Sequence, residues 1–340
     1  MLRNTIRTAA VAAAVGFAAV PAIADNYKPL DADPKEINFG IISTESTQNL
    51  RESWMPLIAD MQKALNMPVK PFFAPDYAGV IEAMRFGKVH VAWYGNKSAM
   101  EAVDRAGAEV FVQEIKADGT QGYYSHILVH KSNDRINSLK DLLACDGSLN
   151  FGIGDPNSTS GFLVPSYYVF AQNNADPKKC FKTVRSANHE ANFMAVANRQ
   201  VDAATNNSEQ VARSKEKAPE ALKNVKIIWT SPLIPADPLA YRKDLSKDLK
   251  AKIKGFFLSY GRLGPDAEAQ KKVLLGLGSG GGGYTDSSNA QLIPIRQLAL
   301  FRDKLKLMSD TRMDAKEKEA KLRAIEEKLA DLNVLEKNMM

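Results

Sequence analysis

Short apolar runs alternate along the chain with longer segments whose apolar residues recur every three or four positions. The short runs predict β-strands, and the longer segments predict amphipathic helices. The elements expected in the first part of the chain are strands at 37–43, 69–74, 90–94 and 109–115 and helices at 47–66, 76–86 and 97–105. This alternation is typical of a mostly parallel sheet with helices on its faces.

A second series of the same kind follows an extended run at residues 123–130 and a polar turn. Its expected strands and helices lie at 149–153, 158–173, 181–186, 190–199, 201–205, 208–223 and 225–231, followed by helices at 247–260, 267–275 and 294–307. Two extended crossovers, near 117–123 and 234–241, would join the two α/β lobes into a hinged clamshell. Ligands of such folds lie at the carboxyl ends of the strands, where the lobes face each other.

The last segment, residues 315–340, predicts a charged helix. Its apolar stripe, at spacings of 3, 4 and 3, consists of Leu322, Ile325, Leu329 and Leu332. The stripe either packs on the protein's own lobe or forms a homodimer contact with a partner helix.

The composition of the chain is typical of a globular protein, and its length suggests about two domains. The chain has 340 residues, of which 45% are apolar and 25% are charged. Its net charge of +6 (45 basic minus 39 acidic residues) is scattered, without a run of Lys or Arg. This pattern gives little support to a nucleic-acid partner, and none is expected.

Residues 1–24 have the pattern of a secretory signal peptide. Arg3 and Arg7 precede an apolar stretch that ends in the small-residue site Ala22-Ile23-Ala24. Cleavage after Ala24 would release a periplasmic protein, and no later run is long and apolar enough to span a bilayer. The alternative is a retained membrane anchor.

The chain contains two cysteines, Cys145 and Cys180. In an oxidising compartment two cysteines are a candidate disulfide pair. Each precedes an expected strand, and neighbouring parallel strands would bring the two residues close together. The alternative is two separate buried thiols. No metal site is expected, because neither cysteine has neighbours at metal-ligand spacing.

The most informative motif is GDPNSTSG at residues 154–161, between an expected strand and an expected helix. Ser158, Thr159 and Ser160 would stand at the first helical turn. Free N–H groups and the dipole at a helix start favour an anion, and hydroxyl groups add hydrogen-bond donors. The alternative is ordinary N-capping, which needs only one hydroxyl. No Lys follows, so the motif is not a Walker-type phosphate loop.

The remaining residues do not form a catalytic set. His189 opens the next helix, where an imidazole could donate to the same anion, but there is no GxSxG or HExxH motif. Residues 278–283 (GSGGGG) match GxGxxG formally, yet no strand precedes them, so a mobile loop is the expected reading. Neither an enzyme nor a cofactor is therefore expected.

Several stretches resemble the phosphonate-binding proteins that serve ABC importers. They are NFGIISTES at 38–46, FFAPDYAG at 72–79, AWYG at 92–95, AMEAVDRA at 99–106, GDPNSTSGFLVP at 154–165, AVANRQVDAATNN at 195–207, SPLIP at 231–235 and PIRQLALF at 294–301. The resemblance implies a type II periplasmic-binding-protein clamshell with a C-terminal helical extension. Its expected parts are lobe 1 (25–122 and 236–310), lobe 2 (123–235) and the charged helix (311–340).

The resemblance also implies roles for residues at matching positions. Ser158, Thr159 and Ser160 would hold the phosphonate oxygens. Tyr123 and His189 would add donors to the same group. Glu209 and Asp237 would hold a ligand amine, and Tyr77 would close over the organic part of the ligand.

These roles predict high-affinity periplasmic binding of a phosphonate, namely 2-aminoethylphosphonate or a similar aminoalkylphosphonate, and delivery to the membrane permease of an ABC importer. Two carboxylates favour an ammonium group and repel a plain phosphate. The alternatives are a binder of phosphite, methylphosphonate or phosphate, a ligand-sensing module for a sensor kinase, and an exported phosphonate or phosphate-ester hydrolase.

Overall fold

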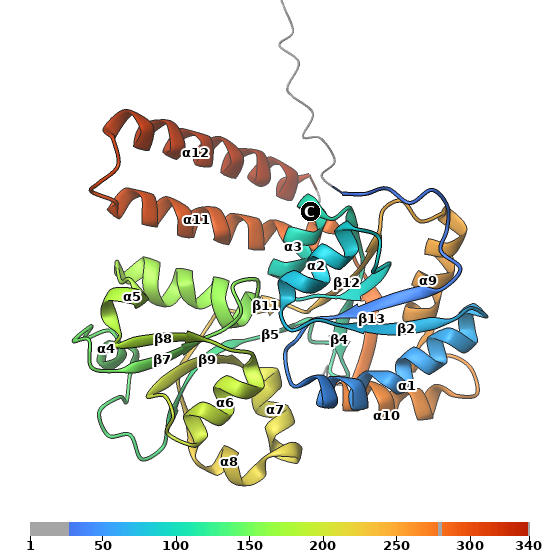
Figure 1. The fold of residues 1–340 in the computed structure, drawn as a ribbon, viewed down its shortest axis with the longest axis horizontal. Helices are drawn as coiled ribbons and strands as arrows, with labels where there is room; N and C mark the ends of the chain where they lie inside the picture. Colours follow the sequence, from blue (N-terminus) through green and yellow to red (C-terminus); the bar gives the residue numbers. More distant parts are fainter. Residues whose placement is uncertain (1–26, 278–280, 339–340) are drawn as a thin grey trace, which may run out of the picture.

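The computed structural model describes residues 27–277 and 281–338. The predicted signal peptide and its cleavage site lie outside the described residues. Within the described part the chain forms two α/β lobes side by side, each built on its own sheet (Figure 1). The prediction of an α/β clamshell is thus confirmed. None of the described helices has the length and hydropathy that a membrane span requires.

Lobe 1 is built on a six-stranded sheet in the order β13-β4-β12-β3-β1-β2. Its strands are β1 (Ile37–Ile41), β2 (Val69–Phe73), β3 (Val91–Trp93), β4 (Ala108–Lys116), β12 (Pro238–Arg242) and β13 (Gly281–Asp286). Its helices are α1 (Thr47–Leu65), α2 (Tyr77–Arg85), α3 (Asn96–Arg105), α9 (Lys247–Ser259) and α10 (Ala267–Gly276). Buried aromatic rings, among them Phe39, Trp54 and Phe257, hold these helices on the sheet.

Lobe 2 is built on a five-stranded sheet in the order β10-β6-β9-β7-β8. Its strands are β6 (Ser125–His130), β7 (Asn150–Ile153), β8 (Thr183–Ser186), β9 (Ala203–Asn207) and β10 (Val225–Thr230). Its α-helices are α4 (Leu139–Leu142), α5 (Pro177–Cys180), α6 (His189–Ala197), α7 (Ser208–Lys217) and α8 (Pro219–Lys223). Cores on the two faces of this sheet include Phe151 and Phe193.

Two short strands connect the lobes. β5 (Gly122–Tyr123) pairs antiparallel with β11 (Ile234–Pro235), where the sequence predicts the crossovers. After the second crossing the chain enters the lobe 1 sheet as β12, between β3 and β4 and antiparallel to both. The prediction of a mostly parallel sheet is therefore wrong for β4, β12 and β13, which form only antiparallel pairs. The reason is that β12 returns from lobe 2 and inserts between β3 and β4, a position that the order of elements in the sequence does not predict.

Two helices predicted in lobe 2 differ from the observed elements. The helix expected over 208–223 breaks after Lys217, because Pro219 cannot continue the hydrogen-bond ladder and begins α8 instead. The helix expected over 158–173 consists of wide turns at Thr159–Leu163 and Ser166–Phe170 and a tight turn at Ala171–Asn173. Wide helical turns are frequent at functional sites.

Of the glycine-rich segment 278–283, residues 278–280 lie outside the described residues. Residues 281–283 belong to a strand, so the expectation of a mobile loop is wrong for them. From Gly281 the chain forms β13, which pairs antiparallel with β4 across a register shift. A Cβ atom on Gly282 would stand 2.2 Å from the Ile115 carbonyl oxygen. Glycine therefore permits the close backbone approach that forms this edge strand.

The C-terminal helices form an antiparallel hairpin of α11 (Ile293–Ser309) and α12 (Ala315–Lys337) that extends from lobe 1 along lobe 2 (Figure 1). Phe301 of α11 contacts Tyr167 of lobe 2, with ring centroids 6.3 Å apart. On α12 Leu329 is buried, while Val334 and Leu335 are exposed. α12 packs along α11, and the other three residues of the predicted stripe, Leu322, Ile325 and Leu332, are half-buried.

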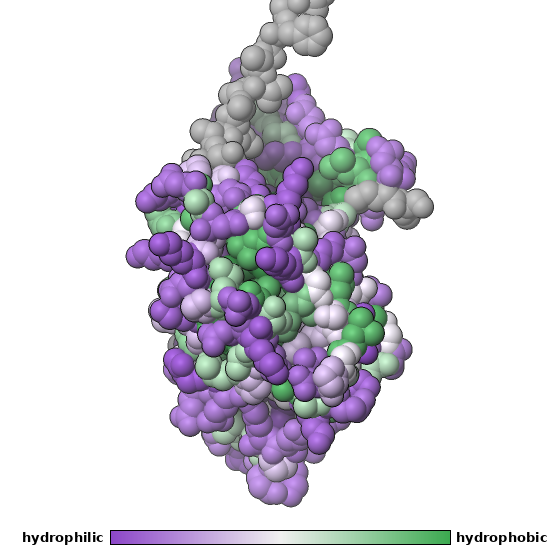
Figure 2. All heavy atoms as spheres, turned by 90° about the vertical axis from the view of Figure 1, so that its right-hand side faces the viewer, coloured by the Kyte–Doolittle hydropathy of each residue, from purple (hydrophilic) through white to green (hydrophobic). Residues whose placement is uncertain are grey.

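The outer side of lobe 1, which Figure 2 presents, is mostly hydrophilic, with apolar side chains in small separate groups. The exposed leucines near α10 include Leu263 and Leu275. Most apolar residues of this lobe instead belong to the core around its sheet.

A disulfide joins Cys145 and Cys180, whose sequence separation is 35 residues. The strands that follow them, β7 and β8, are parallel neighbours, with Asn150 opposite Thr183. Cys180 is buried in one of the lobe 2 cores. The bond therefore ties the start of this parallel pair to the apolar interior.

Replacing both cysteines by alanine should lower the free energy of unfolding by about 2–4 kcal/mol, because the open chain gains conformational entropy when unfolded. Urea unfolding of the oxidised protein and the Cys145→Ala/Cys180→Ala variant measures this difference. Equal midpoints and slopes would show that the bond adds nothing to stability.

Candidate functional site

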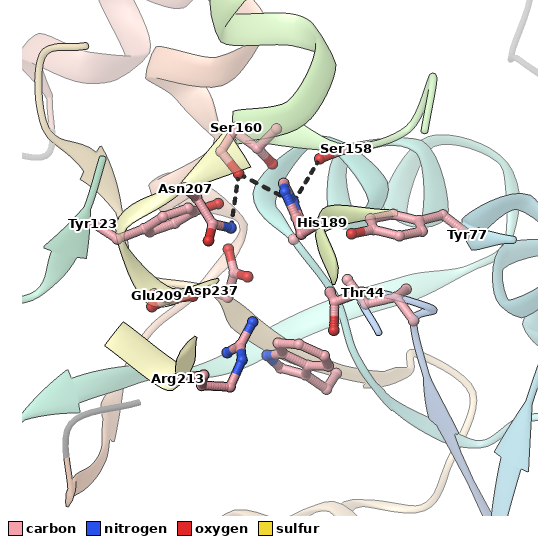
Figure 3. Close-up of a pocket in the computed structure, with 14 residues that line it drawn as sticks. Thr44, Tyr77, Tyr123, Ser158, Ser160, His189, Asn207, Glu209, Arg213 and Asp237 are labelled. Atoms are coloured by element: carbon pink, nitrogen blue, oxygen red, sulfur yellow. Dashed lines mark hydrogen bonds between the residues drawn. The ribbon is translucent and has the colours of Figure 1, made fainter. Parts of the chain in front are cut away.

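A pocket lies between the lobes, and all eight residues predicted for ligand binding line it (Figure 3). These are Tyr77, Tyr123, Ser158, Thr159, Ser160, His189, Glu209 and Asp237. Six further lining residues are Ile42, Thr44, Trp93, Gly95, Asn207 and Arg213. The pocket is thus built from both lobes and from the hinge strand β5.

One end of the pocket is rich in hydrogen-bond donors. Ser158 caps the first wide turn by accepting a hydrogen bond from the Gly161 N–H at 3.0 Å, which uses an oxygen lone pair and not the hydroxyl hydrogen. The Asn207 amide donates to Ser160 Oγ at 3.2 Å, with the same consequence (Figure 3). Both serines are buried. Donors of this kind, at the start of a helical segment, favour an anionic oxygen.

Thr159 connects this end to lobe 1. Its Oγ1 accepts a hydrogen bond from the Lys97 N–H, in the first turn of α3, at 2.8 Å. A Cβ atom on Gly95, the N-cap of α3, would lie 3.2 Å from the same oxygen. Glycine at this position therefore leaves room for Thr159 to reach the helix from the opposite lobe.

His189 is the first residue of α6, and its ring is buried beside the two serines. Its Nε2 lies 3.4 Å from Ser158 Oγ and 3.5 Å from Ser160 Oγ. Burial, assisted by the positive charge of Arg213, lowers the pKa of His189 to about 3. The imidazole is neutral at neutral pH and has one N–H to donate.

The other end of the pocket carries carboxyl groups from opposite lobes. Glu209 stands in the first turn of α7, and Asp237 directly precedes β12. Both are buried, and Figure 3 shows them next to each other. Burial raises the pKa of both groups, and repulsion from Glu209 raises that of Asp237 further. A cation between them would relieve this repulsion.

Two tyrosines flank the space between the two ends. The Tyr123 phenol lies close to the side chains of Asp237 and Ser160 and so faces both ends. Tyr77, the first residue of α2, places its phenol close to the Ser158 side chain. Burial raises the pKa of both phenols, which therefore remain neutral.

The sequence analysis did not select two charged residues that act on this end: Arg213, which lines the pocket, and Glu114, which lies outside the lining and is electrostatically coupled to its carboxyl groups. Arg213, one turn after Glu209 on α7, forms a buried ion pair with Glu45 of lobe 1 at 2.9 Å. Glu114 of β4 is buried, and desolvation followed by repulsion from Glu209 and Asp237 raises its pKa well above the usual range. Two sequence signals could have found them. Arg213 follows Glu209 by four residues, so both lie on one face of a helix. Glu114 follows Val112 by two residues, so both point to the same side of a strand.

Together the two ends suit a small molecule with an oxyanion at one end and an ammonium group at the other. Hydroxyl groups and a neutral imidazole can donate to the oxyanion, while the carboxylates can accept charge-assisted hydrogen bonds from the amine. Among residues 27–277 and 281–338, no cluster of three metal-ligating side chains occurs.

We expect His189 to stay neutral from pH 8 to pH 5, because its pKa is about 3 in the fold. The unfolded chain takes up this proton near pH 6.5. His189 therefore lowers the free energy of unfolding as the pH falls below that value. Imidazole ¹⁵N shifts, assigned with a His189→Asn variant, measure the titration. A midpoint between pH 5 and pH 7 would contradict this account.

Comparison with known proteins places the chain in a family. The family described as "ABC transporter, phosphonate, periplasmic substrate-binding protein" matches residues 39–292. The phosphonates-binding periplasmic protein of Escherichia coli (strain K12) is 50% identical over 329 residues, covering 96% of this chain and 95% of that protein. The phosphate-import protein PhnD of Mycolicibacterium smegmatis is 29% identical over 233 residues, 66% of this chain and 71% of that protein.

A solved structure agrees with these sequence relatives. The crystal structure of a binding-protein component of an ABC phosphonate transporter from Pseudomonas aeruginosa is 50% identical, with a TM-score of 0.85, covering 90% of this chain and 99% of that one. The protein is a binding protein and not an enzyme. It belongs to the family of periplasmic substrate-binding proteins of phosphonate ABC transporters.

Proposed function

We propose that this protein binds 2-aminoethylphosphonate, or a similar aminoalkylphosphonate, with high affinity and delivers it to the permease of an ABC importer. The observation that carries the proposal is the pair of buried carboxyl groups, Glu209 and Asp237, in the same pocket as the buried hydroxyl cluster. Methylphosphonate, phosphite and phosphate lack a cationic group for these carboxylates.

Each predicted site residue then has a role. The phosphonate oxygens accept hydrogen bonds from the three hydroxyls, from His189 and from Tyr123; the hydroxyls are those of Ser158, Thr159 and Ser160. The ammonium group donates to Glu209 and Asp237. Tyr77, from lobe 1, closes over the two methylene groups. Because these side chains come from both lobes, a ligand that contacts them all favours the closed clamshell.

We also propose how the chain is processed and assembled. The signal peptide would be cleaved after Ala24 on export to the periplasm. The two crossovers would separate lobe 1 (25–122 and 236–310) from lobe 2 (123–235). A homodimer through the C-terminal helix would use the apolar side chains that α11 leaves exposed, Val334 and Leu335.

Removing one carboxylate should weaken the amine-bearing ligand selectively. We expect Glu209→Gln and Asp237→Asn each to lower the affinity for 2-aminoethylphosphonate by about 1.5–3 kcal/mol, roughly 10- to 150-fold, and to leave methylphosphonate unchanged or bound more tightly. Titration calorimetry with 2-aminoethylphosphonate, methylphosphonate, phosphite and phosphate measures this selectivity.

The matched control is Thr159→Ala, which removes a donor from the shared anionic group and should weaken all phosphonates alike. If both carboxylate variants bound 2-aminoethylphosphonate as tightly as the wild type, the amine assignment would be wrong. Tightest binding of phosphate by the wild type would favour the phosphate-import function of the Mycolicibacterium relative.

Binding of an ammonium group should release protons from the carboxyl cluster. Burial raises the pKa values of Glu209 and Asp237, so the folded protein holds protons above the ordinary carboxyl range, and a cation favours their loss. The affinity for the amine-bearing ligand should therefore rise with pH through that window.

Calorimetry near pH 6 in two buffers of different ionisation enthalpy measures the protons released. The Glu209→Gln/Asp237→Asn variant is the control, since the proton equilibrium of the phosphonate itself is the same for both proteins. Equal release by wild type and variant would rule out a contribution from this pair.

A further inference from the structure

The lobes cap each other's helices where α1 faces α6. The Thr44 carbonyl of lobe 1 accepts the His189 N–H at 3.1 Å and the Glu190 N–H at 3.4 Å, at the start of α6. In return, the Glu190 carboxylate of lobe 2 accepts the Ser46 N–H at 2.7 Å and the Asn49 side-chain amide at 2.6 Å, at the start of α1. Each helix thus satisfies N–H groups with oxygens of the other lobe.

Two more helices of lobe 1 are capped from lobe 2 in the same way. Asp155 Oδ2 accepts the Tyr77 N–H, at the start of α2, at 3.2 Å. Thr159 Oγ1 accepts the Lys97 N–H of α3, whose own N-cap is a glycine without a side chain. The starts of three helices of lobe 1, α1, α2 and α3, therefore each receive an oxygen from lobe 2.

These hydrogen bonds form only when the lobes are together, because donor and acceptor belong to different lobes. The first N–H groups of a helix have no partner within the helix, and the helix dipole favours a carboxylate beside them. α1 also has its own cap, since Ser46 Oγ accepts the Asn49 N–H. Loss of Glu190 would therefore affect the closed arrangement more than the helix.

Glu190 is the best placed of these groups to act on closure alone. Its carboxylate makes two short contacts to lobe 1, and it is not among the pocket-lining residues. Thr159, by contrast, lines the pocket, so its two roles cannot be separated by one substitution.

We propose that Glu190 is a positioning residue that latches the closed clamshell by capping α1 from the opposite lobe. It sets the affinity for every ligand by the same factor, through the free-energy difference between the open and closed forms, and does not contribute to ligand selectivity. The proposal rests on the proposed function only in using phosphonates as the probe of closure.

The test compares Glu190→Ala with Glu216→Ala, which removes an exposed carboxylate from α7. We expect Glu190→Ala to weaken 2-aminoethylphosphonate and methylphosphonate by the same factor, about tenfold, mainly through faster dissociation. Glu216→Ala should bind as the wild type does. Stopped-flow fluorescence and calorimetry supply the rates and affinities, and the thermal midpoint of each ligand-free variant confirms that it is folded.

A second variant, Asn49→Ala, tests the contact from the other side. Because Asn49 and Glu190 share one hydrogen bond, the double variant should lose less affinity than the product of the two single losses. Strictly multiplicative losses would show that the two residues act independently, which would contradict the latch.

Two other results would overturn the proposal. Unchanged affinity in a folded Glu190→Ala variant would show that the cap does not bias closure. A changed ratio between the two ligands would show that Glu190 acts on one end of the pocket and not on closure. A wild-type protein that bound neither phosphonate would overturn the proposed function and, with it, the role assigned to the latch.

Discussion

Repulsion between buried carboxyl groups is the interaction on which the rest of the site depends. Asp237 and Glu114 belong to lobe 1 and Glu209 to lobe 2, and all three are buried where the lobes meet. Bringing them together out of water costs free energy unless a cation enters or protons are retained, and their raised pKa values express this cost. A ligand with an ammonium group removes the cost at the moment of closure.

Closure then results from opposing contributions. The caps across the cleft, made by Glu190, Asp155 and Thr159, and the ion pair between Glu45 and Arg213 favour the closed form. The carboxyl cluster opposes it. The donor-rich end adds stabilisation only when an oxyanion is present, so a molecule with both charges favours closure most. Ligand recognition is thereby coupled to closure, and the closed form differs in shape from the open form that a permease would meet without ligand.

The two-lobed fold and the anion-binding motif could be predicted from the sequence, for physical reasons. Strand–helix alternation predicted two α/β lobes, because periodicity reflects which face of each element is buried. The motif at 154–161 indicated an anion site, because helix starts need partners whatever the tertiary fold. The roles of Glu209, Asp237 and Tyr77 came only from the family resemblance, since a lone carboxylate or tyrosine has no local signature.

The features that sequence reasoning missed depend on contacts between distant segments. The position of β12 and the edge strand β13 are decided by pairing with β4. Glu114 and Arg213 acquire their importance only when the lobes meet, and so does Glu190. In contrast, the break of the expected 208–223 helix at Pro219 is a local effect that the proline itself could have indicated.

A crystal structure with 2-aminoethylphosphonate tests the central claim most directly. The account predicts the phosphonate oxygens within hydrogen-bond distance of the Ser158, Thr159 and Ser160 hydroxyls and the nitrogen between the Glu209 and Asp237 carboxylates. A ligand bound in the reverse orientation, or outside this pocket, would contradict it.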